Sequence, residues 1–326
     1  MRAMILAAGF GTRLWPLTVD RTKPAIPVLG RPLIGHVAAY LAGAGIKEVL
    51  VNLHHEGESV RRALGNGSDF GVELTYVEEP EILGTSGALD NARPLLEDSP
   101  FVVINGKIIT DIDLKAAIEA HKREDALATL VLLPNVKRER FSEVLTAGNL
   151  VTGFGGMPAA TSDSDSESPL MFTGIQILSP RVFSYIPRGR FSHSTTDVYP
   201  QAIAAGERII GHVASGSWYE LSTIPRYLEI SLHLMREQQQ KVYVGQGSRI
   251  IPSAEVENSI LWENVVVGDG ARIDRCVIAD GVNIPSGEMI SNAAVVRADV
   301  VSGITPPAKA LKGEIKGANF VVPLYG

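Results

Sequence analysis

Short apolar runs alternate with amphipathic stretches in the first part of the chain, and this alternation predicts strands separated by helices. Four apolar runs are too short for helices and are predicted to be buried strands: 3–6, 48–53, 72–77 and 101–104. Between the first two runs, Leu33, Val37 and Leu41 fall on one stripe of a helix. Strands that alternate with helices form βαβ units, so we expect an α/β fold with a doubly wound, mainly parallel, Rossmann-like sheet.

The same two patterns, short apolar runs and helical stripes of apolar residues, continue to about residue 240. They predict helices over 59–64, 88–96, 197–205 and 224–240 and a strand over 208–214. In the last helix, Leu228, Leu232 and Met235 are expected to face the core.

After residue 241 the pattern changes to apolar residues at intervals of about six, with glycine and asparagine between them. The apolar positions are Val256, Trp262, Val267, Ile273, Ile278 and Ile284. This period leaves no room for helices and is typical of a hexapeptide β-helix, although a plain small β-domain also fits. We therefore expect two domains, residues 1–240 and 241–326, the second a short left-handed β-helix-like domain.

A β-helix of this length would have only about three coils, because each coil takes three hexads. The last coil of so short a stack would leave its apolar end exposed to solvent unless another segment covers it. Either the tail that contains Pro306-Pro307 or a second copy of the chain would cover it, so a homo-oligomer formed through this domain is possible.

Composition and charge narrow the class of protein. Apolar residues make up 45% and charged residues 20% of the chain, which is an ordinary globular balance. A net charge of −6 without a Lys/Arg cluster argues against nucleic acid as the main partner. Cys276 is the single cysteine, so an internal disulfide is excluded, and we expect it to be a buried packing residue. The apolar runs are too short to span a membrane, and a cytoplasmic protein is expected.

The first strand ends in a glycine-bearing stretch, Leu6-Ala7-Ala8-Gly9-Phe10-Gly11-Thr12-Arg13-Leu14. Glycines there let the backbone approach a ligand, and free N–H groups in the loop favour an anion. Arg13 adds a fork of donors and Lys23 a mobile positive charge, so the stretch reads as a triphosphate cradle. A tight βα turn without a ligand is the alternative. The spacing is not that of the P-loop, and Leu14 occupies the third glycine position of the dinucleotide fingerprint.

Four further polar stretches are candidates for a loop, cap or ligand-binding role. Leu83–Gly87 is expected to be a loop before the helix 88–96, either an N-cap alone or a contact to a base or ribose. Asp111 and Asp113 precede a helix of about ten residues, where carboxylates cap free N–H groups; metal binding is the weaker alternative. His54-His55 is assigned a surface or loop role, because adjacent strand residues point to opposite faces. Ala160–Pro169 is polar and acidic and is expected to be a mobile surface loop.

Taken in order, these motifs resemble the sugar-1-phosphate nucleotidylyltransferases, and most closely the mannose-1-phosphate guanylyltransferases. The residues that carry the resemblance are Leu6–Leu17, Lys23-Pro24, Leu83–Gly87, Asn105-Gly106, Phe172–Ile175 and Trp218–Tyr227. The implied reaction joins a sugar 1-phosphate to a nucleoside triphosphate and releases pyrophosphate, with GDP-mannose as the first candidate product.

The resemblance also implies roles for individual residues. Arg13 and Lys23 would be catalytic, and the nucleotide would be bound by Leu6, Ala8, Gly9, Gly11, Thr12, Arg13, Lys23, Gly84 and Thr85. The sugar side would be formed by Asn105, Gly106, Thr173 and Gly174.

Two positions depart from the family pattern. Relatives hold Mg²⁺ with two aspartates, and here those positions are Lys107 and Glu220. A protonated lysine cannot ligate Mg²⁺, so the cofactor expected of an active member is in doubt. We hypothesise that Lys107 and Glu220 form an ion pair in place of the metal bridge; drift in a protein that no longer needs the metal is the alternative. Gly156-Met157-Pro158 and Thr195-Thr196 also replace charged motifs that some relatives use for the sugar phosphate.

Two functions from different classes remain open. The first is a nucleotidylyltransferase that makes a nucleotide sugar, and the second is a non-catalytic regulatory protein that keeps the nucleotide pocket. An acyltransferase activity in the hexapeptide region is disfavoured, because no histidine follows His233.

Overall fold

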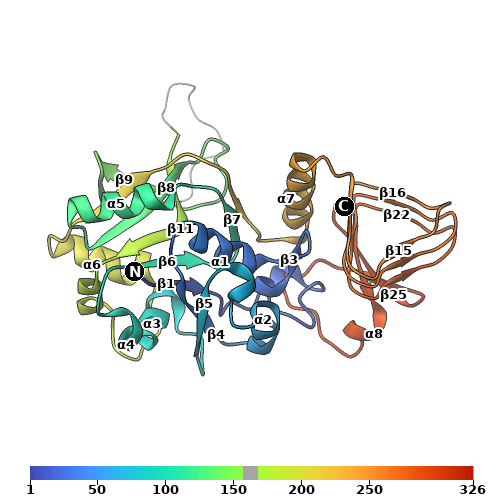
Figure 1. Cartoon of the computed structure of the whole chain (residues 1–326), viewed down its shortest axis with the longest axis horizontal. Coiled ribbons are helices and arrows are strands. Elements are labelled where there is room, and N and C mark those ends of the chain that lie inside the picture. Colours follow the sequence, from blue (N-terminus) through green and yellow to red (C-terminus); the bar gives the residue numbers. More distant parts are fainter. Residues whose placement is uncertain (157–167, 326) are drawn as a thin grey trace. The chain divides into compact units, whose positions relative to one another are not determined.

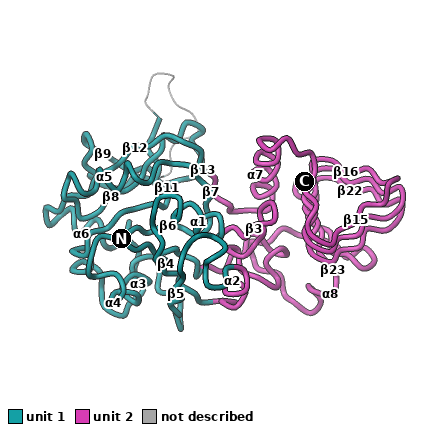
Figure 2. Tube along the Cα trace, in the orientation of Figure 1, with its two compact units in different colours: residues 1–8, 34–54, 64–218 teal, residues 9–33, 55–63, 219–326 magenta. Residues whose placement is uncertain are grey.

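The computed structural model describes residues 1–156 and 168–325. The chain divides into two compact units whose segments interleave along the sequence (Figure 2). Unit 1 comprises Met1–Ala8, Ile34–His54 and Leu64–Trp218, and unit 2 comprises Gly9–Leu33, His55–Ala63 and Tyr219–Gly326. The domain boundary at residue 240 stays a prediction. Met157, Pro158 and most of the loop expected over 160–169 lie outside the described residues.

Unit 1 is built on a nine-stranded sheet with the order β5-β4-β1-β6-β11-β8-β12-β10-β9 (Figure 1). Its strands are β1 (Ala3–Leu6), β4 (Glu48–Leu53), β5 (Glu73–Glu78), β6 (Phe101–Asn105), β8 (Ala128–Pro134), β9 (Val144–Ala147), β10 (Leu150–Phe154), β11 (Leu170–Leu178) and β12 (Ile209–Val213). The strands β5, β4, β1 and β6 are all parallel. The strand β11 runs antiparallel to β6 and β8, and β8 and β12 are again parallel. The predicted α/β fold with a parallel-rich sheet is confirmed.

The helices are α1 (Leu33–Gly43), α2 (Gly57–Leu64), α3 (Gly84–Asn91), α4 (Arg93–Leu96), α5 (Leu114–Glu124), α6 (Tyr199–Ala204), α7 (Ile224–Glu237) and α8 (Ala298–Val301). The short strands outside the large sheet and the β-helix are β2 (Pro27–Val28), β3 (Arg31–Pro32), β7 (Ile108–Thr110) and β13 (Trp218–Glu220). The predicted stripes are buried: Leu33, Val37 and Leu41 in α1, and Leu228, Leu232 and Met235 in α7. In the described residues no helix is both long and apolar enough to cross a membrane.

The prediction of one helix over 88–96 after a loop is wrong in two respects. The helix α3 already begins at Gly84, because the carbonyl of Ser192 accepts the N–H groups of Ser86 (3.0 Å) and Gly87 (3.3 Å). It ends before α4, since Pro94 has no N–H to donate to the carbonyl of Asp90. The start of α3 thus depends on a residue far away in the sequence.

The segment from residue 242 onward forms parallel strands in three rows, β14-β17-β20-β23, β15-β18-β21 and β16-β19-β22. The strands are β14 (Val242–Val244), β15 (Arg249–Ile250), β16 (Glu255–Glu257), β17 (Ser259–Leu261), β18 (Val266–Val267), β19 (Arg272–Asp274), β20 (Val277–Ile278), β21 (Asn283–Ile284), β22 (Met289–Ser291) and β23 (Ala293–Arg297). Within each row, neighbouring strands are one coil apart and pair in parallel, as Val242 does with Ser259. The predicted hexapeptide β-helix of about three coils is confirmed.

The C-terminal tail covers one edge of this stack. The strand β25 (Asn319–Pro323) pairs antiparallel with β23 and with β24 (Glu314–Lys316). Phe320 and Val322 on β25 are buried. Of the two expected covers, the tail therefore takes the β23 edge, while Pro306-Pro307 lies in irregular chain before β24.

Cys276 is buried inside the β-helix, as expected, and burial raises the pKa of its thiol to about 12. At pH 8 the reactive thiolate is then about one part in ten thousand. We expect iodoacetamide to label Cys276 negligibly in the folded chain and readily in guanidinium chloride, as measured by mass spectrometry. Equal labelling rates in the two conditions would contradict the burial of this thiol.

Candidate functional site

The glycine-bearing loop, residues 9–13, and Lys23 belong to unit 2. Gly11 has a left-handed backbone (φ 65°), and a Cβ at Gly11 would lie 2.8 Å from the Cβ of Lys23. Only glycine accepts both constraints without strain. The structure therefore brings Gly11 and Lys23 together, and a 3₁₀ turn over Thr12–Leu14 follows directly.

Gly9 is different, because neither its backbone nor its packing requires glycine. A Cβ at Gly9 would meet no atom of the described chain within 4 Å, and its φ is not in the left-handed region. Thr12 and Arg13 are exposed beside it, and within the described chain the Arg13 guanidinium has no ion pair or hydrogen bond. This open backbone with a cation beside it suits an anionic ligand that approaches closely.

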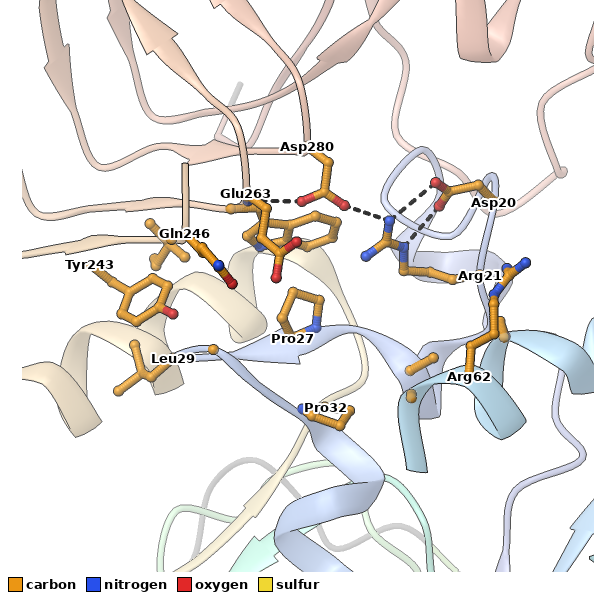
Figure 3. A pocket seen from close by; sticks show the side chains of 17 residues that line it. Asp20, Arg21, Pro27, Leu29, Pro32, Arg62, Tyr243, Gln246, Glu263 and Asp280 are labelled. Atoms are coloured by element: carbon orange, nitrogen blue, oxygen red, sulfur yellow. Dashed lines mark hydrogen bonds and ion pairs between the residues drawn. The ribbon is translucent and has the colours of Figure 1, made fainter. Parts of the chain in front are cut away.

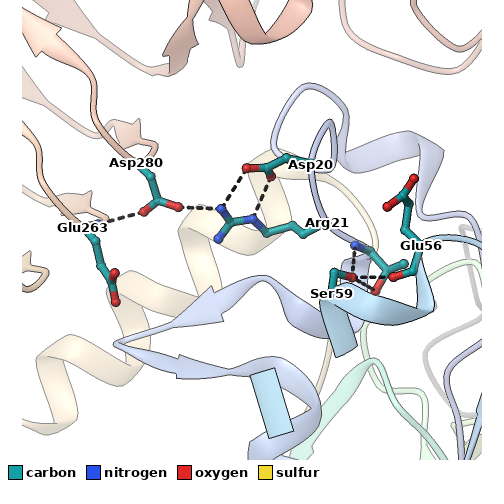
Figure 4. Close-up of polar contacts among 7 residues, drawn as sticks. Asp20, Arg21, Glu56, Ser59, Glu263 and Asp280 are labelled. Carbon is teal, nitrogen blue, oxygen red and sulfur yellow. Dashed lines mark hydrogen bonds and ion pairs between the residues drawn. The ribbon is translucent and has the colours of Figure 1, made fainter. Parts of the chain in front are cut away.

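The backbone at Lys23 is held by buried polar contacts on the preceding residue (Figure 4). The Thr22 N–H donates to the Ser59 hydroxyl (3.0 Å), and that hydroxyl donates to the carbonyl of Glu56 (2.8 Å). Thr22 and Ser59 are both buried. Lys23 then opens a short 3₁₀ turn with Pro24, so its position is set from the backbone rather than by its own flexible side chain.

In unit 1 a buried polar network joins the carboxyl ends of three parallel strands. The Ala7 N–H donates to Asn52 Oδ1 (2.7 Å), and Asn52 Nδ2 donates to Glu79 Oε1 (2.6 Å). The other carboxylate oxygen of Glu79 accepts the N–H of Leu83, just before α3 (3.2 Å). This edge is where ligands bind in open α/β sheets. Our sequence reasoning missed Asn52 and Glu79; the signal was a lone amide in an apolar strand and a carboxylate ending the next one.

Gly84 and Thr85, predicted to bind nucleotide, form the first turn of α3. A Cβ at Gly84 would lie 2.5 Å from the Ser192 carbonyl oxygen, so the two backbones touch. The Thr85 hydroxyl accepts the N–H of Ser194 (2.9 Å), and His193 Nδ1 lies 3.4 Å from it. Residues 192–194 thus support this turn, and no pattern in the sequence predicts this support. The contact of Gly84 and Thr85 with a base stays a prediction.

Three of the four residues predicted for the sugar side meet at the end of β1 and β6. A Cβ at Gly174 would overlap the Asn105 amide, and Gly174 has φ 81°. The Gly106 N–H donates to the Leu6 carbonyl (2.9 Å). Thr173 differs, since its buried hydroxyl donates to the Val131 carbonyl (2.8 Å) and so serves the sheet.

The two residues predicted to replace the metal ligands of the family, Lys107 and Glu220, lie in different units. Lys107 is half-buried directly after Gly106 in unit 1. Glu220 ends β13 in unit 2, and its carbonyl accepts Arg226 Nε (2.8 Å). The donor set at these positions does not fit Mg²⁺, since a protonated lysine offers no lone pair. In the part of the chain that the structure describes, no group of three or more His, Cys, Asp and Glu side chains is placed to hold a metal.

The alternative carboxylates are used by the backbone. Asp113 caps α5 by accepting the N–H groups of Lys115 (3.0 Å) and Ala116 (3.1 Å), which confirms the predicted cap. The expectation that Asp111 also caps this helix is wrong, because its carboxylate instead accepts the N–H of Ser217 (2.6 Å), just before β13. The two histidines lie just beyond β4, as predicted, and His55 is exposed beside the Phe10 ring (5.5 Å between centroids).

A cavity of about 550 Å³ lies within unit 2 (Figure 3). Arg21, Arg62, Tyr243, Trp262, Glu263 and Asp280 are among the residues that line it. None of the residues predicted to bind nucleotide is among its described lining. It is therefore distinct from the loop at Gly9 and Gly11.

Comparison with known proteins gives two family matches. Residues 2–237 match the family described as nucleotidyl transferase, and residues 235–302 match the family described as GlmU-like, C-terminal hexapeptide. The first match covers most of the chain, including the glycine-bearing loop and Glu220.

Individual relatives differ in the base and the sugar that their names carry. The chain is 34% identical to the N-acetylmuramate alpha-1-phosphate uridylyltransferase of Neisseria meningitidis, over 70% of this chain and 96% of the relative. It is 27% identical to the mannose-1-phosphate guanylyltransferase of Mycobacterium tuberculosis, over 88% and 82%. A Bacillus anthracis structure described as a glucose-1-phosphate thymidylyltransferase in complex with sucrose matches with a TM-score of 0.63 at 27% identity, over 73% and 96%.

Gly9 and Gly11 give a matched pair of substitutions. We expect Gly11→Ala to lower the free energy of unfolding by about 1 to 2 kcal/mol, because alanine is strained in the left-handed region and its Cβ meets Lys23. Gly9→Ala should leave the free energy of unfolding unchanged, since its Cβ points into open space. Urea denaturation of the two variants measures both values; equal losses would contradict the assignment.

Proposed function

Because the chain belongs to the nucleotidyl transferase family, we propose that it joins a nucleoside triphosphate to a sugar 1-phosphate, giving a nucleotide sugar and pyrophosphate. GDP-mannose is the first candidate product, on the resemblance carried by Trp15-Pro16-Leu17 and the similarity to a guanylyltransferase. Uridylyltransferases are equally similar, so base and sugar are to be identified by experiment. In this proposal residues 1–240 form the nucleotidyltransferase domain.

The observation that carries the proposal is the contrast between the two loop glycines. At position 11 a glycine is required by the close contact with Lys23. At position 9 no contact within the described chain requires a glycine. A backbone that must stay bare, next to the exposed Arg13, supports close approach of a phosphate group. Arg13 and Lys23 would then neutralise the phosphate charge, and a guanidinium and an ammonium are suited to that task.

In the proposed reaction, an oxygen of the sugar 1-phosphate attacks the α-phosphorus of the triphosphate, and the bond to the departing pyrophosphate breaks. Both reactants are anions, so the rate depends on alignment and on positive charge near the phosphates. Arg13 and Lys23 supply that charge in this proposal. Asn105 and the backbone at Gly106 and Gly174 hold the sugar phosphate, while the hydroxyl of Thr173 stays in the sheet.

A second function is supported by the substituted metal positions. Mg²⁺ supplies Lewis-acid charge in active relatives, and Lys107 and Glu220 do not reproduce the donors for it. We propose that these two side chains form an ion pair in its place. A chain with this substitution would bind a nucleotide or nucleotide sugar and turn over slowly or not at all, as a regulatory protein does.

Arg13→Ala and Lys23→Ala should each weaken triphosphate binding by about ten-fold or more, because each removes a charge-assisted contact worth about 1.5 to 3 kcal/mol. Calorimetric titration with GTP, UTP and dTTP measures the dissociation constants and identifies the base. Lys241→Ala, which also removes an exposed lysine of unit 2, is the control and should leave them unchanged. Unaltered affinity in both test variants would contradict the proposal that Arg13 and Lys23 bind the triphosphate.

Nucleotide affinity should be nearly independent of Mg²⁺ in the unchanged chain, apart from chelation of the free nucleotide. The double variant Lys107→Asp, Glu220→Asp should gain Mg²⁺-dependent pyrophosphate release, and each single variant should gain less, since the two positions act together. The assay is coupled pyrophosphate release with mannose 1-phosphate and other sugar 1-phosphates. Fast Mg²⁺-dependent turnover by the unchanged chain would rule out the regulatory function and the ion pair, while leaving the enzymatic function intact.

A further inference from the structure

Within unit 2, Arg21 ties the segment that carries Lys23 to the β-helix (Figure 4). Its guanidinium donates to both carboxylate oxygens of Asp20, at 2.8 and 3.1 Å, and to Asp280 Oδ2 at 2.5 Å. Asp280 follows β20, so this contact joins residues 259 positions apart in the sequence. The guanidinium also lies 5.0 Å from the centre of the Trp262 ring.

Asp280 is itself fixed by the coil. Its other oxygen, Oδ1, accepts the N–H of Glu263 (2.9 Å), and Figure 3 shows both residues at the wall of the cavity. The Trp262 indole is buried, and its N–H donates to the Tyr227 hydroxyl (2.9 Å) on α7. Arg21 therefore meets a rigid carboxylate and a rigid ring, which is a preorganised seat for a planar guanidinium.

The charges around Arg21 favour a permanent contact. Burial alone would lower the pKa of Arg21, but its hydrogen bonds and ion pairs with Asp20 and Asp280 raise it well above its ordinary value. Arg21 thus stays charged at every pH at which the chain is folded. Removing one carboxylate from a partly buried ion pair costs more stability than breaking an exposed ion pair, because the remaining charge is poorly solvated.

Arg21 is connected to the glycine-bearing loop through the next two residues of the chain, Thr22 and Lys23. Thr22 follows Arg21 and is held by Ser59, and Lys23 follows Thr22. Lys23 in turn packs directly against Gly11, so the Lys23 segment and the loop are in close contact. A shift of Arg21 would therefore move Lys23 relative to the loop.

We propose that Arg21 is a positioning residue, through which the β-helix holds Lys23 at the distance from the Gly9–Gly11 loop that nucleotide binding needs. This inference rests on the proposed function, because it assigns the β-helix a part in the nucleotide site. It predicts that Asp280, far from Lys23 in the sequence, controls nucleotide affinity.

Arg275 offers a matched control in the same β-helix. It forms an ion pair with Glu229 on α7 and a hydrogen bond with Asn292 (3.1 Å), and none of these partners lies in residues 9–33. Arg275→Ala removes the same side chain and one ion pair without touching the Lys23 segment. It should lower the melting temperature and leave nucleotide affinity unchanged.

The experiment compares Arg21→Ala, Arg21→Lys, Asp280→Asn and Arg275→Ala with the unchanged chain, by calorimetric titration with the best nucleoside triphosphate at a temperature where circular dichroism shows all of them folded. We expect Arg21→Ala to raise the dissociation constant about ten-fold. Asp280→Asn keeps an acceptor for the Glu263 N–H and loses only the charge, so it is the milder variant and should act in the same direction. Arg21→Lys should fall between, because it keeps the charge without the fork.

The double variant Arg21→Ala, Asp280→Asn should be no weaker in binding than Arg21→Ala alone, since both changes break one contact. Dissociation constants of Arg21→Ala and Asp280→Asn within two-fold of the unchanged chain would overturn the inference, even with a lower melting temperature, and would leave the proposed function standing. If Arg21→Ala does not fold, Asp280→Asn decides alone. Absence of nucleotide binding by the unchanged chain would overturn both.

Discussion

The close approach of Gly11 to Lys23 is the constraint on which the proposed site depends. A left-handed glycine and a lysine backbone held by a buried Thr22–Ser59 hydrogen bond leave no room for any other residue at position 11. This contact places the backbone of Lys23 directly beside the glycine-bearing loop. Within the same loop, Gly9 has an open backbone, and Arg13 adds a second positive charge. The chemistry proposed for the chain follows from this arrangement, since phosphate groups are bound by charge and by backbone N–H groups.

The sequence predicted those features that depend on neighbours in the chain. The short apolar runs located β1, β4, β5 and β6, the helical stripes located α1 and α7, and the interval of about six located the β-helix, because each pattern records which residues are buried. Asp113 was correctly predicted to cap α5, since a cap needs only the next three residues. The start of α3 at Gly84 was missed because it depends on the Ser192 carbonyl, and the Asn52–Glu79 pair was missed because it joins two strands. The first contact leaves no local pattern, and the second leaves only a lone amide in one apolar strand and a carboxylate at the end of the next.

The division into units could not be predicted for the same reason. Residues 9–33 follow β1 directly, yet they share a compact unit with the β-helix. Contacts such as Arg21 to Asp280 and the Trp15 ring against Phe320 (5.5 Å between centroids) carry this association, and they bridge most of the chain length. In the proposed account, the β-helix supports the nucleotide loop and is not only an appended domain. Lys107 and Glu220, at positions where the resemblance implies metal-binding aspartates, would also change the charge that the phosphates meet in the proposed site.

The central claim is that residues 9–14 and the Lys23 turn bind the phosphates of a nucleoside triphosphate. Hydrogen–deuterium exchange of the unchanged chain, with and without a saturating nucleoside triphosphate, tests it directly, because bound phosphate protects the backbone N–H groups that it engages. The account predicts slower exchange over residues 9–14 and 22–26 when nucleotide is bound. Binding with unchanged exchange in both segments, and protection instead around the cavity lined by Tyr243 and Glu263, would contradict it.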